Sequence, residues 1–234
     1  MKASKTIYFD DIGDVTFTKR RDAKNIKVRI VGSHVRVSLP TWVPYSSAIS
    51  YIKQRTEWIN QNRRQAVILR NGTVFGKDLR LLVKLTESSR ISSKFIAGIL
   101  TVNVPIDKDI SSDDVQKKIK ERVIKILQMQ AEQLLVPRVR QLAKTGEYDV
   151  NRIEVRRLRS RWGSCTSEKN MTFNLFLIQL PWQFIDYVIY HELSHTVHMN
   201  HGSQFWALVE SHVPNYKLIR KLMANYSPDI ILQT

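Results

Sequence analysis

Residues 191–201, HELSHTVHMNH, carry four of the six histidines of the chain. His191 and His195 stand at positions i and i+4, so on a helix both imidazoles lie on the same face. Two imidazoles in this arrangement can bind one Zn²⁺ ion, and Glu192 can accept a proton from a water molecule beside it. The segment therefore predicts a helix that carries a zinc site, with Glu192 as its catalytic base.

A catalytic zinc site uses three protein ligands, so a third residue is expected after this pair. His201 lies beyond the expected helix, and its neighbours Asn200 and Gly202 are residue types that turn the chain. His198 is the alternative third ligand. On a helix that continues to residue 198, however, His198 would lie about 11 Å along the axis from His191. We therefore expect His201 to complete the site.

The residues on either side of the motif favour helices. Pro181 suits a first helical turn, and the apolar pattern after it comprises Phe184, Ile185, Val188 and Ile189. The expected helix covers residues 181–197. A second helix is expected within 203–211, with Ser203 at its N-cap.

Two strands are expected before this helix. Residues 151–165, NRIEVRRLRSRWGSC, predict a strand that runs into a turn at Gly163, and residues 171–181, MTFNLFLIQLP, predict another. On the first strand, side-chain alternation would place three arginines in one row, namely Arg157, Arg159 and Arg161. Such a row could bind phosphate groups, or it could be an exposed charged edge that prevents aggregation.

Four further residues are candidates for the oxyanion donor or for support of a metal ligand. His198, His212 and Tyr216 carry groups that could stabilise an oxyanion. Asn174, on an otherwise apolar strand face, could hydrogen-bond the histidine-bearing helix or one of its histidines. A structural or surface role is the alternative for each of them.

The front of the chain has a different character. Short strands are expected over residues 6–40 with a turn at residues 32–33, followed by a helix over 46–64 and strands over 79–87 and 98–105. A long helix is expected over 111–136, capped by Ser111 or Ser112. Pro137 should end or kink it, and Gly146 should stop whatever continues.

The elements together predict an α+β fold in two parts. Residues 1–108 would form a β-rich N-terminal unit with one helix. Residues 109–234 would form a zincin-like metallopeptidase domain, in which the HExxH helix packs on a small mixed sheet. The 234 residues are enough to bury a sizeable core in either arrangement.

Charge and composition constrain the partners. The chain has 37 basic and 21 acidic residues, a net charge of +16, which makes nucleic acid a candidate partner. No stretch approaches the ~20 apolar residues that span a bilayer, and the first residues lack the apolar segment of a secretory signal. With a single cysteine, Cys165, a disulfide framework is excluded. We expect a cytoplasmic protein with no membrane partner and assign no oligomeric state.

Several motifs resemble the YgjP-like metallopeptidases, which are zincin-type proteins similar to the SprT and WLM peptidase groups. They are RWGSC at 161–165, LPWQFIDYVIYHELSH at 180–195, MNHGSQFW at 199–206 and PNYK at 214–217. The resemblance is dense over residues 152–222 and looser in RRDAKNIKVRI and TEWINQN of the front half. It implies that His191, His195 and His201 bind zinc and that Glu192 is the catalytic base.

These observations predict a zinc-dependent peptidase acting on a peptide or protein substrate. One alternative is a nucleic-acid-binding module with a structural or vestigial zinc site, or a peptidase recruited to nucleic acid. The HExxH pattern fixes the chemistry of the water molecule and not the substrate, so a zinc hydrolase acting on other bonds is a further alternative.

Overall fold

The structure is a computed structural model that describes residues 4–31, 34–62 and 68–226. The chain forms two compact units, Met1–Val67 and Ile68–Thr234. The expected boundary between residues 108 and 109 lies inside the second unit and stays a prediction. Within the described residues, no helix combines the length and the apolar character of a membrane span.

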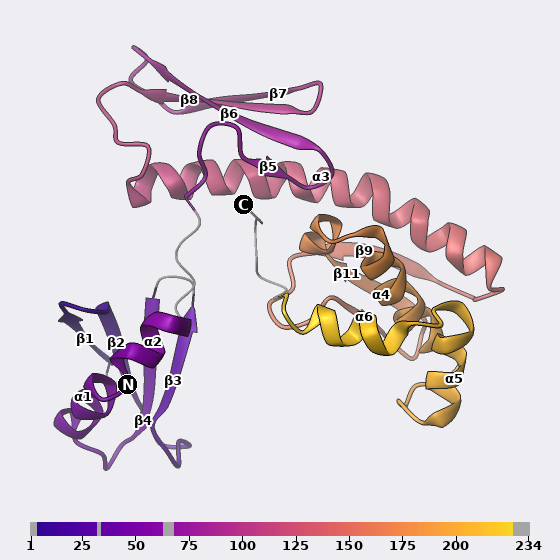
Figure 1. The fold of residues 1–234 in the computed structure, drawn as a ribbon, viewed down its shortest axis with the longest axis horizontal. Coiled ribbons are helices and arrows are strands. Elements are labelled where there is room, and N and C mark those ends of the chain that lie inside the picture. Colours follow the sequence, from indigo (N-terminus) through magenta and orange to yellow (C-terminus); the bar gives the residue numbers. More distant parts are fainter. Residues whose placement is uncertain (1–3, 32–33, 63–67, 227–234) are drawn as a thin grey trace. The chain divides into compact units, whose positions relative to one another are not determined.

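The first unit is a four-stranded sheet with two helices on one face (Figure 1). The strands are β1 (Ser4–Phe9), β2 (Gly13–Arg20), β3 (Lys27–Val31) and β4 (His34–Pro40), and the helices are α1 (Tyr45–Lys53) and α2 (Thr56–Asn62). The sheet order is β1-β2-β4-β3, with β2 and β4 parallel and the other pairs antiparallel. The predicted turn at residues 32–33 lies outside the described residues.

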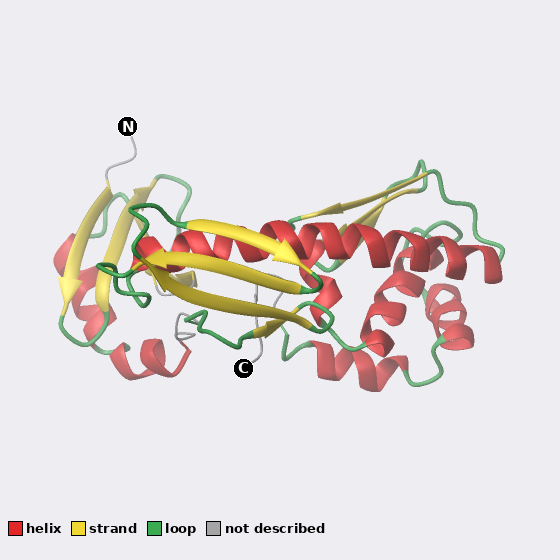
Figure 2. Cartoon of the chain, turned by 90° about the horizontal axis from the view of Figure 1, so that it is seen from above, coloured by secondary structure: helices red, strands yellow, loops and turns green. Residues whose placement is uncertain are grey.

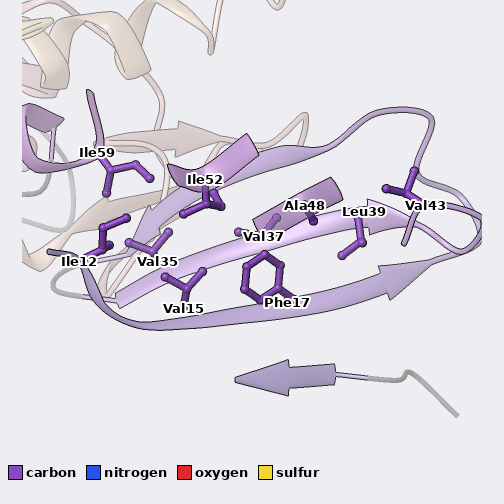
Figure 3. Close-up of a cluster of buried hydrophobic side chains, with 10 residues drawn as sticks. All are labelled: Ile12, Val15, Phe17, Val35, Val37, Leu39, Val43, Ala48, Ile52 and Ile59. Atoms are coloured by element: carbon purple, nitrogen blue, oxygen red, sulfur yellow. The ribbon is translucent and has the colours of Figure 1, made fainter. Parts of the chain in front are cut away.

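Alternating residues of β2 and β4 build the core of this unit. Val15 and Phe17 on β2 and Val37 on β4 are fully buried against Ile52 of α1 and Ile59 of α2 (Figure 3). The prediction of one helix over 46–64 was wrong. The chain turns at residues 54–55, where the backbone N–H of residue 55 donates to the carbonyl of Ile52 and closes α1.

A second four-stranded sheet opens the second unit. Its strands are β5 (Val74–Phe75), β6 (Leu79–Thr86), β7 (Ser92–Ile96) and β8 (Ile99–Pro105), in the order β5-β6-β8-β7. β6 and β8 confirm the two predicted strands, and they pair in parallel. β7 was not expected, because all five of its residues are exposed and show no apolar alternation.

Helix α3 (Asp113–Thr145) runs uninterrupted through Pro137 (Figure 2). The prediction that Pro137 would end the helix was wrong, and the alternative that Pro137 kinks the helix stays a prediction. Buried residues continue beyond it, at Val139 and Leu142, and their packing offsets the roughly 3 kcal/mol that an interior proline costs. Gly146 forms the C-cap, as predicted. Ser112 is the N-cap residue, but its hydroxyl donates to the Asp109 carbonyl and makes no cap hydrogen bond.

The remaining elements build a smaller mixed sheet with helices. They are β9 (Arg152–Arg156), β10 (Gly163–Cys165), β11 (Asn170–Asn174), the 3₁₀ helix η1 (Leu175–Gln179), α4 (Trp182–Ser194), α5 (Ser203–His212) and α6 (Tyr216–Met223). The sheet order is β10-β11-β9, with β11 parallel to β9 and antiparallel to β10. Over the described residues the chain is therefore α+β, with six α-helices and small mixed sheets.

Both strands predicted in this region are shorter than expected. The second ends at Asn174, whose side-chain oxygen accepts a hydrogen bond from the N–H of Phe176 and begins η1. The four apolar residues after Asn174 are all buried, so their sequence is compatible with a buried 3₁₀ helix as well as with a buried strand. The first predicted strand ends at Arg156 and resumes only at Gly163.

Candidate metal centre

Helix α4, which carries the histidine motif, is anchored at its start and middle. Asp186 receives two hydrogen bonds from the guanidinium of Arg138 on α3, at 2.8 and 2.6 Å. The Lys77 ammonium donates to the Leu180 carbonyl just before α4, at 2.5 Å. Apolar side chains along the helix are buried, including Ile185 and Leu193. The histidine motif therefore lies on a helix whose position is fixed by these contacts.

The helix ends earlier than predicted, at Ser194 with His195 as its C-cap. The chain then turns through residues 196–202, so that His201 returns to the two histidines of α4. The Nε2 atoms of His191 and His201 are 3.1 Å apart. One ligand atom from each of His191, His195 and His201 lies within 4.8 Å of the other two.

This spacing suits a metal ion. Four-coordinate zinc holds imidazole nitrogens at about 2.0–2.1 Å, which places two of them roughly 3.3 Å apart. Among the described residues, the Nδ1 atom of His191 is buried without a hydrogen-bond partner, and its Nε2 atom is the one that lies beside Nε2 of His201. The three residues expected to be ligands are thus brought together in a geometry that fits an ion.

His198 supports the cluster through its backbone. The Nδ1 atom of His195 lies 3.1 Å from the His198 carbonyl oxygen, so Nδ1–H donates and the Nε2 lone pair of His195 stays free for a metal. The His198 imidazole is not part of the three-histidine cluster in the described residues.

Burial favours the neutral form of His191 and His195. Burial, together with the charges of the neighbouring His195 and His201, lowers the pKa of His191 to about 3. Burial also lowers the pKa of His195. The fully buried Phe205 packs against these rings, with centroids 4.6 Å from His195 and 5.0 Å from His191. Neutral imidazole is the form that binds a metal ion.

Glu192 is buried next to this cluster. Its exposed fraction is 5%, and burial raises the pKa of its carboxyl to about 8, while the charge of Arg161 acts in the opposite direction. The carboxyl lies directly against Gly163 of β10: a Cβ atom at that glycine would be 2.7 Å from Oε1. The absence of a side chain at residue 163 is what leaves room for the carboxyl.

A cavity of about 340 Å³ opens beside the cluster. His191 and Glu192 form part of its wall. The other lining residues are Arg161, Trp162, Gly163, Tyr187, Val188, Arg220, Met223 and Ala224. The candidate centre therefore faces a space large enough for part of a ligand.

Asn174 is fully buried and acts on the chain beside the cavity. Its amide nitrogen donates to the carbonyls of Leu158 and Arg161, at 3.0 and 3.1 Å, and its backbone N–H donates to the Trp162 carbonyl. These bonds fix the segment between β9 and β10 that lines the cavity. The expected hydrogen bond from Asn174 to the histidine-bearing helix stays a prediction.

His212 and Tyr216 lie in different settings. The Nε2 atom of His212 is 2.9 Å from the Tyr148 hydroxyl, and its ring stacks on Tyr190. Tyr216 is buried and stacks on Trp206 at 5.2 Å, and Trp206 in turn contacts the rings of two cluster histidines. The oxyanion role of these two residues stays a prediction.

The three arginines do not lie on a strand, because β9 ends at Arg156. The expected row was therefore wrong for a physical reason: the hydrogen bonds of Asn174 draw this segment into a loop. Arg157 lies over the ring of Phe176, Arg159 is exposed, and Arg161 lines the cavity. Contact with nucleic acid through these residues stays a prediction.

Two cavity residues were missed by sequence reasoning. Tyr187 stands four residues before His191 and shares its helix face, so the same i, i+4 rule could have found it. Arg220 lies on α6, and no local signal connects it to the motif. It reaches the site only because α6 packs near α4 in the folded chain.

Known proteins were compared with the whole sequence. A family model described as "YgjP-like, metallopeptidase domain" matches residues 24–226. Among solved structures, the chain is similar to the metallopeptidase zymogen of Pyrococcus abyssi abylysin, with 20% identity and a TM-score of 0.36 over 39% of this chain and 93% of that chain. A likeness of this TM-score does not bear on the fold. No curated protein matches the sequence.

Proposed function

The chain belongs to the YgjP-like metallopeptidase family, and from this premise we propose that it is a zinc-dependent peptidase of the HExxH zincin type. His191, His195 and His201 would hold the zinc ion, and Glu192 would be the general base. The observation that carries this proposal is the convergence of three imidazole nitrogens within 4.8 Å, beside a buried carboxyl.

The donor set supports zinc as the metal. Imidazole suits zinc, and three protein ligands leave a fourth position open for chemistry. A bound zinc ion supplies Lewis acidity, which lowers the pKa of a water molecule to ~7 and polarises the scissile carbonyl.

Glu192 performs the proton transfers in this proposal. Its carboxylate accepts a proton from the attacking water and gives it to the leaving amine. Burial favours the protonated form of this carboxyl and so raises its pKa towards the working pH, where a group can both accept and give up a proton. Gly163 leaves room for the carboxyl because it has no side chain there.

An extended peptide would bind along a sheet edge. In the sheet β10-β11-β9, the central strand β11 is paired on both sides and has no free edge. The edge strands of this sheet are β9 and β10. Of these, β10 carries Gly163 beside Glu192, so we assign substrate pairing to β10.

Metal analysis tests the site. We expect near-stoichiometric zinc in the purified protein and its loss in His191→Ala and His195→Ala, because each variant removes one of three ligands. Glu192→Gln should keep its zinc and lose hydrolysis of a peptide library by about 10²–10⁴-fold. His198→Ala is the matched control, since only its backbone carbonyl supports the cluster. Zinc that survives both ligand substitutions would refute the metal site.

We also propose a cellular location and a relationship to a wider group of peptidases. We place the protein in the cytoplasm because its one cysteine requires no oxidising compartment. The kinship with SprT-type peptidases rests on the sequence motifs.

A further inference from the structure

We propose that the cavity beside Glu192 binds a carboxylate group of the substrate between Arg161 and Arg220. This inference rests on the proposed function, and it names the class of peptide that the site prefers. The carboxylate would belong either to an Asp or Glu side chain next to the scissile bond or to the free C-terminus of a short product segment.

The cavity has the size and lining for one acidic residue. Its volume of about 340 Å³ is at the low end of the ~300–1,000 Å³ of ligand pockets. Val188, Met223 and Trp162 supply apolar wall for the methylene groups of a side chain. Because Glu192 and His191 lie in the same wall, whatever enters is adjacent to the reacting centre.

The lining is electrostatically unbalanced. It holds two guanidinium groups, Arg161 and Arg220, and one acidic group, the buried Glu192. Neither arginine forms an ion pair with an acidic side chain of the described residues. Some other arginines of this unit do form ion pairs, for example Arg138 with Asp186 at 2.6 Å. Two cations and a single carboxyl line the cavity, so an entering carboxylate would add a partner for the guanidinium groups.

The backbone of Arg161 and the guanidinium of Arg220 are both held by contacts within the chain. The Arg161 backbone is fixed by the hydrogen bond from the buried Asn174 to its carbonyl oxygen, at 3.1 Å. The Arg220 guanidinium lies over the ring of Trp206 at 4.9 Å, and Trp206 stacks on Tyr216. A guanidinium that is already positioned loses less side-chain entropy when it binds a carboxylate.

Matched peptides test the preference. One pair carries Glu or Gln at each position flanking the cleaved bond, and a second pair ends in a free carboxylate or an amide. With the zinc-loaded protein, we expect kcat/KM to be about tenfold higher for the carboxylate member of one pair, which is typical of a hydrogen bond to a charged group. The pair that shows the difference identifies the source of the carboxylate.

Variants connect the preference to the two arginines. Arg161→Gln and Arg220→Gln should each lower the preference to about threefold or less, and the double variant should abolish it. Arg159→Gln and Lys221→Gln are the controls, since both residues are exposed, belong to the same two segments and do not line the cavity. They should leave the preference unchanged, which excludes a general effect of net charge.

Binding separates this inference from the proposed function. The same peptides are titrated against zinc-loaded Glu192→Gln protein, with dissociation constants read from fluorescence anisotropy. If no peptide is cleaved but Glu peptides bind more tightly in an arginine-dependent way, the function fails and the inference stands. If peptides are cleaved without a carboxylate preference, the inference is overturned. A preference that survives the double arginine variant also overturns it, because the carboxylate then binds the metal.

Discussion

The two units of the chain bury different kinds of residue. The core of the first unit is an apolar cluster of sheet and helix side chains, centred on Phe17. In the second unit the core contains three buried polar residues, Asn174, Glu192 and Ser194, which are the only ones among the described residues. All three lie within the segment from the end of β11 to the end of α4.

The three buried polar residues differ in how far hydrogen bonds offset the loss of stability that their burial causes. Ser194 donates to the Tyr190 carbonyl, and Asn174 makes several hydrogen bonds. The Glu192 carboxyl has no hydrogen bond within the described residues. Burial of such a group lowers stability, and the proposed role of Glu192 as general base gives a reason for its presence. Among the described residues the first unit has no buried polar side chain, whereas the second gives up part of its stability at the proposed catalytic centre.

The largest effect is expected in the apolar cluster. Phe17→Ala removes a fully buried aromatic side chain and should lower the free energy of unfolding by about 3–5 kcal/mol. Zinc content of the folded protein should not change, because all three ligands belong to the second unit. Denaturant unfolding and metal analysis measure the two quantities. Tyr8→Ala, at an aromatic residue that is 68% exposed in the same sheet, is the control. Equal losses in both variants would contradict the assigned core.

The next effect is the loss of folding stability that the buried Glu192 carboxyl causes in the metal-free protein. Its pKa is about 8 in the folded chain and about 4.5 when unfolded. The unfolded state therefore releases a proton that the folded state keeps, so stability is lost as pH rises from about 4.5 through 8. Glu192→Gln lacks this loss. Its advantage over the natural chain should grow by about 4 kcal/mol between pH 5 and 9.

Urea midpoints of the two chelator-treated proteins between pH 5 and 9 measure this difference. His191 has the opposite dependence, since its lowered pKa costs stability as pH falls below about 6.5. The His191 contribution to the free energy of unfolding is present in both proteins. It therefore cancels when the value for one protein is subtracted from the value for the other. A difference that does not vary with pH would show that the carboxyl is not buried in the folded state.

Features that depend on local sequence patterns were predicted well in both units. In the first unit, alternating residues such as Val15 and Phe17 predict strands because one sheet face is buried and the other is not. The clustering of the three histidines was equally predictable, because His191 and His195 follow a helical period and the turn residues around His201 are local signals. Where a residue's role depends on its neighbours in sequence, reading the sequence was enough.

The misses depend on contacts that are distant in sequence. Pro137 lies inside α3 because packing along the helix outweighs the local preference of proline. The predicted arginine row fails because a buried asparagine on another strand bends the segment. Arg220 joins the cavity from α6. None of these follows from periodicity, since each is decided by packing between elements.

Asn174 provides a smaller effect. Asn174→Ala leaves the Leu158 and Arg161 carbonyls without their donor and should destabilise the chain by about 1–3 kcal/mol. Asn170→Ala, at the other end of β11, is the matched control, because its side-chain amide makes no hydrogen bond within the described residues. Thermal unfolding of the two variants gives the comparison. Equal stability would mean that the loop beside the cavity is held by other contacts.

The smallest effect tests whether the polar centre is packed as closely as the apolar core. In Gly163→Ala the new Cβ would lie 2.7 Å from Oε1 and 2.8 Å from Cγ of Glu192, so the carboxyl must move. We expect kcat/KM to fall about tenfold, or roughly 1.4 kcal/mol in the barrier, because a displaced base transfers protons less well. Zinc should be retained. Gly202→Ala, next to the ligand His201, is the control, since its Cβ would meet nothing within 4 Å. If Gly163→Ala keeps full activity, the carboxyl has room to adjust, and close packing is confined to the apolar cores.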